Sequence, residues 1–327
     1  MEKQEGMTLT ELMISLSVFT IIVAVTMTSI STFSKAFTSM DATNQLKSCS
    51  QKAINKIGLR LSECKRIFQN TAADTPFLLR ITDIETPLSN SRLPRIIETG
   101  SLSPGDSLFD ASGVGNSLFF ANTEFPEILQ LSSSYTARID CYVFNYYYLV
   151  PVSGITIGNT PALKLMEWHS KKYADYKQIM AFTDTNTRTL IINQLKNRQI
   201  DYAWDPAATS VSSAFYLLEA GNPTPSVVSG HMIQKDTYED MTKFARGVIW
   251  GRYKAGVSPN TGGAFNTDHP VPKYAIASQN FPSGFEVAII GPRSAHRVFI
   301  RMVLVAQGPS MLVAFENPVL TSARNLW

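Results

Sequence analysis

Glu11 is the charged residue with the most unusual surroundings in this chain, because it heads a membrane-length apolar segment. The twenty-three residues that follow it, Leu12 to Ser34, carry no charge. A carboxylate in such a segment costs about 2.5–3.5 kcal/mol on insertion scales unless it finds a partner. An acid in this position is therefore a functional-site hypothesis.

Gly6 and Glu11 together carry a resemblance to a known family. The stretch from Gly6 to Glu11 resembles the processing site of type IV prepilins. The resemblance implies that a prepilin peptidase cuts after Gly6, that the new amino terminus at Met7 is N-methylated, and that Glu11 becomes the fifth mature residue. In filaments of this family the carboxylate pairs with the freed amino terminus of a neighbouring subunit, which fixes the stagger between their helices.

Three other interpretations of this segment compete with the prepilin one. A secretory signal peptide has an apolar region of only about 7–15 residues and a cleavage site after it. A plain signal anchor fits the length, about 34 Å against a hydrocarbon core of about 30 Å, but leaves Gly6 and Glu11 unexplained. A buried core helix is unexpected at an amino terminus. The leader, residues 1–6, has one Lys and two Glu, so positive-inside bias supports the orientation only weakly.

Hydroxyl side chains make the apolar segment only moderately hydrophobic. Ser and Thr hydroxyls can bond back to helix carbonyls or across to another helix, which would lower the cost of leaving the bilayer; alternatively they face protein in an ordinary bundle. The nine are Ser15, Ser17, Thr20, Thr26, Thr28, Ser29, Ser31, Thr32 and Ser34.

Beyond the membrane segment, the periodicity predicts that the helix continues. Apolar or small residues recur mostly three or four positions apart, which is typical of a helical seam: Phe33, Phe37, Met40, Leu46, Cys49, Ala53, Ile57, Leu61, Cys64 and Phe68. We expect one helix from about Met7 to Gln69, ended by the polar stretch 70–76. In pilins the second half of such a helix packs on a β-sheet.

The remainder of the chain is predicted to be β-rich, with one further helix at Asn186 to Gln199. The expected strands are 77–84, 117–121, 138–150, 162–169, 176–182, 214–218, 247–253, 285–290, 298–306 and 311–315, and the expected loops are 101–116, 221–230 and 256–272. A carboxyl-terminal hairpin followed by Arg324 and Asn325 resembles J-type pseudopilins of type II secretion and W-type minor pilins.

Cys49, Cys64 and Cys141 lie in a part expected outside the cytoplasm, where disulfides persist. On one helix, Cys49 and Cys64 would be about 22 Å apart and could not pair. A bridge to Cys141, for which Cys64 is the candidate, and three small buried side chains are both compatible with the sequence.

Residues suited to catalysis are sparse. The four His residues show no metal-binding spacing, and we expect no metal or cofactor. Ser62 and Lys65 match an SxxK pattern without its companion motifs. A basic cluster could contact an acidic partner or DNA, but we expect it to form a solvated strand face: Arg293, His296, Arg297 and Arg301. The net charge of +3, or +4 without the leader, is too small and scattered to indicate nucleic-acid binding.

The sequence thus predicts an α+β, membrane-anchored minor pilin or pseudopilin. Its expected parts are a leader (1–6), a transmembrane and assembly helix (7–34), an amphipathic continuation (35–70) and a β-rich periplasmic or extracellular head (71–327). Expected partners are the prepilin peptidase, other pilins or pseudopilins, an inner-membrane assembly platform and the lipid bilayer. The alternatives are a filament-displayed adhesion or DNA-binding module and a membrane-anchored periplasmic enzyme.

Overall fold

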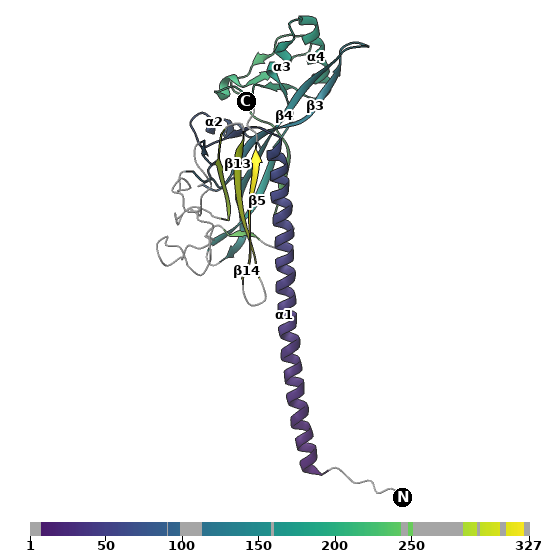
Figure 1. Ribbon diagram of the computed structural model, residues 1–327, viewed down its shortest axis with the longest axis vertical. Coiled ribbons are helices and arrows are strands. Elements are labelled where there is room, and N and C mark those ends of the chain that lie inside the picture. Colours follow the sequence, from purple (N-terminus) through teal and green to yellow (C-terminus); the bar gives the residue numbers. More distant parts are fainter. Residues whose placement is uncertain are drawn as a thin grey trace.

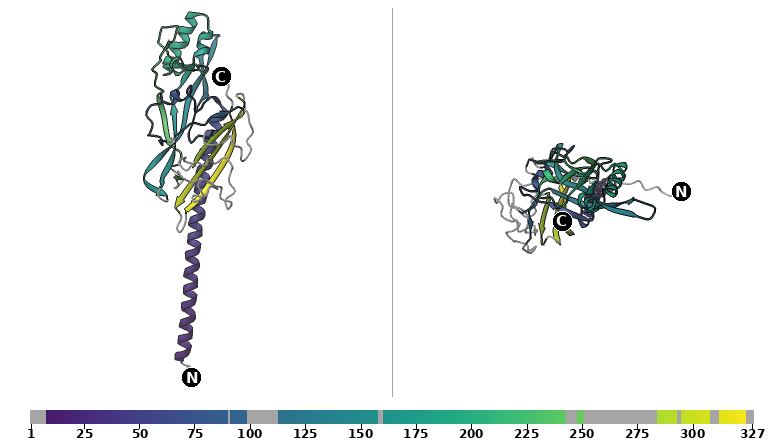
Figure 2. Two further views of the ribbon diagram at one scale, coloured as in Figure 1. Left: turned by 90° about the vertical axis from the view of Figure 1, so that its left-hand side faces the viewer. Right: turned by 90° about the horizontal axis from the view of Figure 1, so that it is seen from above.

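A single long helix carries a β-rich head, which confirms the predicted α+β class. The computed structural model describes residues 8–89, 91–98, 113–157, 160–242, 248–250, 284–292, 295–307 and 312–323. Helix α1 (Leu9–Ser62) is 54 residues long and projects far beyond the head. Two perpendicular views place the helix amino terminus at one end of an elongated molecule and the head at the other (Figures 1 and 2).

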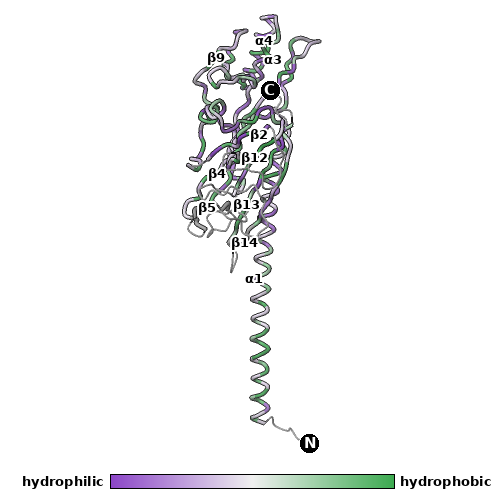
Figure 3. Tube along the Cα trace, turned by 60° about the vertical axis from the view of Figure 1, so that its left-hand side comes forward, coloured by the Kyte–Doolittle hydropathy of each residue, from purple (hydrophilic) through white to green (hydrophobic). Residues whose placement is uncertain are grey.

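Helix α1 has two halves with different surroundings. Its first half is exposed, and Figure 3 shows that this protruding part is largely apolar. Buried side chains begin at Leu46 and continue to Leu61 at helical spacing. They pack mainly against β14 (Leu312–Ala323) and β13 (His296–Gln307), so the second half of α1 is part of the head.

The helix ends at Ser62, and the prediction that it continues to Gln69 is wrong. Residues Cys64–Phe68 form strand β1, which pairs antiparallel with β3 (Leu118–Gln130). Within β1, Arg66 is buried and makes a 2.8 Å ion pair with Asp74. The apolar spacing of β1 suited a helix equally well, but strand pairing and this ion pair decide the conformation.

The described strands form one sheet. Its main path runs in the order β2-β12-β13-β11-β5-β4-β6-β7-β8-β9; β3 pairs with β4 and β1, β10 with β5, and β14 with β13. The remaining strands are β2 (Ile96–Ile97), β4 (Thr136–Ile157), β5 (Thr160–Ser170), β6 (Tyr173–Asp175), β7 (Tyr202–Trp204), β8 (Phe215–Leu217), β9 (Ser226–Val227), β10 (Lys235–Asp240), β11 (Val248–Trp250) and β12 (Phe285–Ile290).

Most of the longer predicted strands are confirmed, and two predictions are wrong. Segment 176–182 is helix α3 (Tyr176–Ala181), because the Asp175 carboxylate caps it by accepting a hydrogen bond from the Gln178 backbone N–H. Segment 77–84 is not a strand: its first two residues belong to the short helix α2 (Thr75–Leu78), which has a proline in its first turn. The predicted helix near 186–199 is confirmed as α4 (Thr185–Asn197).

Three large core clusters divide the head along its length. The first lies between α1 and the sheet and includes Leu61, Phe120 and Met302. The second is aromatic and includes Phe144 and Trp204, whose ring centroids are 4.9 Å apart. The third lies under α3 and α4, at the end of the head farthest from the helix amino terminus (Figure 1).

Candidate membrane and assembly segment

Glu11 lies in the first turn of α1, and its carboxylate forms a capping box with Thr8. Oε2 accepts the Thr8 backbone N–H at 2.9 Å and the Thr8 hydroxyl at 2.8 Å. An acid here also suits the positive end of the helix dipole. The side chain is exposed in the isolated chain, so it remains available to another subunit. Gly6 and Met7, the predicted processing residues, lie outside the described residues.

The protruding part of α1 can cross a membrane by length and composition. Among the described residues it is the one helix that passes this test, and none of its most apolar window is buried in the head. Its large apolar side chains face outward on every side: Leu12 is 54% exposed and Ile22 57%. A helix that is apolar all round needs an apolar environment, which a bilayer or a bundle of similar helices supplies.

Five of the nine hydroxyl side chains of this segment donate to carbonyls of the same helix. Ser17, Thr20 and Thr26 each donate to the carbonyl four residues earlier, at 2.7–2.8 Å. Thr28 and Thr32 do the same at 2.8 and 2.9 Å. Back-bonding of this kind was one of the two roles expected for these side chains, and it lowers the cost of placing a hydroxyl in hydrocarbon.

A buried carboxylate ties the second half of α1 to the sheet. Glu167 of β5 is 3% exposed. Its oxygens lie 2.5 Å from Lys56 Nζ and 3.4 Å from Arg60 Nη1, and it accepts the Tyr147 hydroxyl at 2.8 Å. Arg60 also donates to the Asn145 side chain. These polar contacts fix how the helix lies on the head. No local pattern in the sequence indicates these long-range partners.

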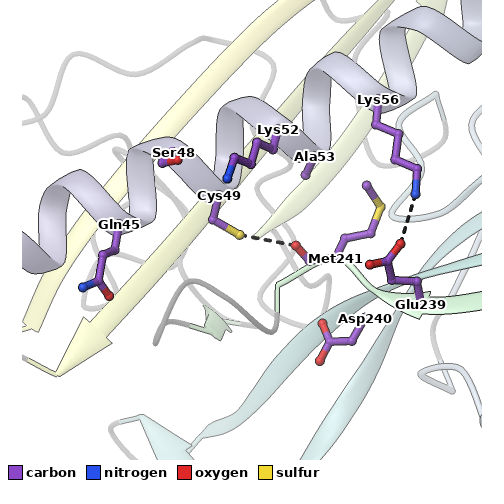
Figure 4. Close-up of a pocket in the computed structure, with 9 residues that line it drawn as sticks. All are labelled: Gln45, Ser48, Cys49, Lys52, Ala53, Lys56, Glu239, Asp240 and Met241. Atoms are coloured by element: carbon purple, nitrogen blue, oxygen red, sulfur yellow. Dashed lines mark hydrogen bonds and ion pairs between the residues drawn. The ribbon is translucent and has the colours of Figure 1, made fainter.

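A small cavity of about 290 Å³ adjoins this junction, between α1 and the end of β10 (Figure 4). Cys49 donates to the Met241 carbonyl at 3.3 Å, and Lys56 pairs with Glu239 at 3.1 Å. Burial raises the pKa of the Cys49 thiol, which disfavours the reactive thiolate. The cavity therefore contains a polar contact between helix and head but no activated nucleophile.

The three cysteines are free thiols, so the candidate Cys64–Cys141 disulfide is not formed. Cys64 lies on β1, opposite Asn122 of β3, whereas Cys141 lies on β4, opposite Glu124 of β3. A whole strand therefore separates the two thiols. All three cysteines are buried, as in the alternative interpretation.

The expectation that Arg301 and His296 face solvent is wrong. Both are fully buried. Arg301 bonds Glu286 at 2.5 Å and Glu316 at 2.7 Å, and this charge cluster spans three strands. The expectation that the alternate charged residues of this strand face solvent failed because charges distant in sequence pair across strands. Arg293 lies outside the described residues.

The described histidines are not part of a metal-binding cluster. Within the described residues, no group of three His, Cys, Asp or Glu side chains could hold a metal ion. His231 lies 3.0 Å from the Tyr173 hydroxyl in an aromatic cluster, and His296 lies 3.0 Å from the Gly291 carbonyl. The Ser62 hydroxyl of the SxxK pattern donates to the Leu59 carbonyl. His269 lies outside the described residues.

Comparison with protein families gives one match. Residues 1–27 match the model of the prokaryotic N-terminal methylation motif. The motif and the apolar helix together support a type IV prepilin-like protein. For a prepilin-like chain, the motif implies processing by prepilin peptidase and assembly with other pilins. No curated protein and no solved structure matches the chain.

Proposed function

We propose that this prepilin-like chain is a minor pilin or pseudopilin that takes part in assembling a type IV pilus or a type II secretion pseudopilus. The observation that carries the proposal is the methylation motif at residues 1–27 leading directly into an exposed apolar helix. After cleavage behind Gly6 and methylation of Met7, the first half of α1 holds the subunit in the inner membrane. The head then lies in the periplasm, ready for transfer into a filament.

Glu11 provides the recognition step of this proposal. A neighbouring subunit's freed amino terminus neutralises the carboxylate, which removes the cost of keeping either charge in an apolar helix bundle. The contacts with Thr8 hold the carboxylate at the helix surface until that partner arrives. The role is structural rather than enzymatic.

A position in an initiation or tip complex suits the size of the head. The sheet and the subdomain of α3 and α4 extend well to one side of the helix axis and beyond its end (Figures 1 and 2). Such a head would crowd a regular shaft. This part of the proposal rests on the resemblance to J-type and W-type subunits. The loops 101–116 and 256–272, on which an adhesive or DNA-binding role would depend, lie almost wholly outside the described residues.

Intact-mass analysis of the membrane-extracted protein tests the proposal. We expect the loss of residues 1–6 and the gain of one methyl group on Met7, in cells that contain an active prepilin peptidase. Deletion of the peptidase should leave Met1 in place. If Met1 is retained while the peptidase is active, the chain is not a processed pilin.

A further inference from the structure

Strand β3 leaves one edge of its second half without a neighbouring strand. Strand β1 pairs with β3 as far as Asn122, and beyond that residue β4 is the one described strand that pairs with β3. An edge of this kind presents backbone N–H and C=O groups in a row, and such a row can pair with a strand of another chain. This stretch of β3, from Glu124 to Gln130, lies beside α4 (Figure 1).

The hairpin of β3 and β4 fixes the direction of the backbone groups in this stretch. The Leu131 N–H donates to the Tyr135 carbonyl at 2.9 Å, so the odd-numbered residues at the end of β3 face β4. In an antiparallel pair, the residues between them direct their N–H and C=O groups away from the partner strand. The backbone groups of Ile128 and Gln130 therefore point towards the free edge.

Two side chains of α4 occupy the carbonyls of that edge. Gln194 Nε2 donates to the Gln130 carbonyl at 2.5 Å. Arg198 Nη2 donates to the Ile128 carbonyl at 2.7 Å. Residues four apart on a helix are about 6 Å apart along its axis, which is close to the spacing of about 6.8 Å between alternate residues of a strand. The two donors therefore match two successive outward carbonyls.

Further contacts hold α4 in this position. Leu129 is fully buried and belongs to one core cluster with Ile191 and Leu195 of α4. Arg198 also forms an ion pair with Glu127 of β3. The shared core and the ion pair keep the helix where its two donors reach the strand edge.

Prolines occur on this edge and on a second free edge of the sheet. Pro126 precedes Ile128 by two residues, in the irregular part of the pairing with β4, and offers no N–H to another strand. Strand β14 pairs with β13 alone among the described strands, and its Pro318 lies opposite Arg301. Because Pro318 cannot donate to Arg301, its nitrogen faces the free edge of β14. Natural sheets use prolines and covering helices to prevent pairing between edges.

We propose that α4 is an edge cover, which through Gln194 and Arg198 prevents β3 from pairing strand to strand with the β3 of a second copy. A chain held in a membrane by α1 shares one surface with its other copies, which raises their local concentration. An open edge would then meet the same edge of another copy often. The edge cover concerns the head alone and does not depend on the proposed role in pilus or pseudopilus assembly.

Removal of the two donors tests the edge cover. The open-edge variant is the full chain with Gln194→Ala and Arg198→Ala, and its self-association is measured by sedimentation velocity in detergent. The control combines Lys171→Ala with Asn186→Ala, which removes an exposed cation after β5 and an exposed amide at the other end of α4. We expect the open-edge variant to associate about tenfold more tightly than the control, which corresponds to the net gain from one or two hydrogen bonds between strands.

A proline placed on the edge separates strand pairing from a general loss of structure. Ile128→Pro removes an outward N–H that the pairing with β4 does not use, so the hairpin should be retained while pairing with a second copy is blocked. Added to the open-edge variant, Ile128→Pro should return the association to the level of the control. Hydrogen exchange in residues 124–131 should be slower in the open-edge variant, and the added proline should reverse this protection.

Two results would overturn the edge cover: a folded open-edge variant that associates no more tightly than the control, and an association that Ile128→Pro leaves unchanged. Circular dichroism establishes that each variant is folded. If the double variant does not fold, Gln194→Ala alone, which keeps the ion pair of Arg198 with Glu127, is compared in the same way. Either result would leave processing at Gly6, and with it the proposed function, unaffected.

Discussion

Lys56 of α1 lies 2.5 Å from the carboxylate of Glu167, a side chain that the head buries almost completely. Arg60, one turn later, reaches the same carboxylate at 3.4 Å. Two cations of the helix thus converge on one anion of the sheet. This cluster sets the direction in which the helix leaves the head.

Glu167→Gln should destabilise the head by about 2–4 kcal/mol, because it leaves two cations facing a neutral amide in a largely buried place. Glu239→Gln removes the other carboxylate near Lys56, but that side chain is 42% exposed and its loss should cost less than about 1 kcal/mol. Urea unfolding of both variants in detergent, followed by circular dichroism, separates the two. Equal stability of the two variants would show that Glu167 is not the main anchor.

Truncation should show that the second half of α1 belongs to the head. A chain beginning at Phe37 keeps every helix residue of the main core cluster and should be soluble and monomeric. A chain beginning at Glu63 keeps β1 but uncovers Phe120, Met302 and their neighbours, an apolar patch too large for a soluble monomer. Size-exclusion chromatography and circular dichroism compare them. If the shorter chain were monomeric and equally stable, the helix would be a detached anchor.

The long elements of the fold could be predicted from the sequence better than the boundaries between elements. The long helix, the hairpin of β13 and β14, and strands such as β4 and β12 follow from local spacing and composition, and all are present. The boundary at Ser62 did not follow, because the segment after it has an apolar spacing that fits either helix or strand. The Asp175 cap of α3 was visible in the sequence and outweighs the β-propensity of the residues after it.

Some residues of the candidate site could be predicted from local sequence, and others could not. Gly6, Met7 and Glu11 form a local motif and could be found from their spacing alone. The role of Glu167 could not be predicted, because Lys56 and Tyr147 reach it from elements that are distant in sequence. Arg301 was assigned to the wrong side of its strand, because Glu286 and Glu316 are separated from it by fifteen residues in either direction.

His231 should make the stability of the head depend on pH. It is buried among Tyr173, Tyr202 and Phe215, and burial, with Arg80 nearby, lowers its pKa from 6.5 to about 4. As the pH falls, His231 is protonated in the unfolded chain before it is protonated in the folded chain. Its contribution to the free energy of unfolding is therefore intact above pH 6.5 and is lost as the pH falls towards 4.

The full loss for His231 amounts to about 3 kcal/mol. His231→Gln, which retains a partner for the Tyr173 hydroxyl but does not titrate, should flatten the stability profile between pH 7 and pH 4.5. Denaturant unfolding at several pH values measures the effect. A variant with the profile of the original chain would assign the pH dependence to other groups.

All three cysteines should remain reduced in air. Burial raises the pKa of Cys141 to about 12 and that of Cys64 further still, so almost no thiolate is present to start a disulfide exchange. Alkylation of the denatured protein without reductant should label three thiols, and alkylation of the native protein few or none. A peptide joining Cys64 to Cys141 would contradict the observed strand arrangement.

Glu11→Gln should separate membrane insertion from assembly. The neutral side chain lowers the cost of insertion and leaves Gly6 untouched, so insertion and cleavage should proceed. The variant cannot neutralise a neighbour's amino terminus, and its amount in sheared filaments or in the assembly complex should fall at least tenfold, the effect of about 1.4 kcal/mol. Asp41→Asn is the matched control, because Asp41 is an exposed acid of the same helix beyond the membrane segment. Immunoblots of the membrane and filament fractions measure how much of each variant is inserted and how much is incorporated. If Glu11→Gln entered filaments as well as Asp41→Asn, the stagger between subunits would have to be set by other contacts.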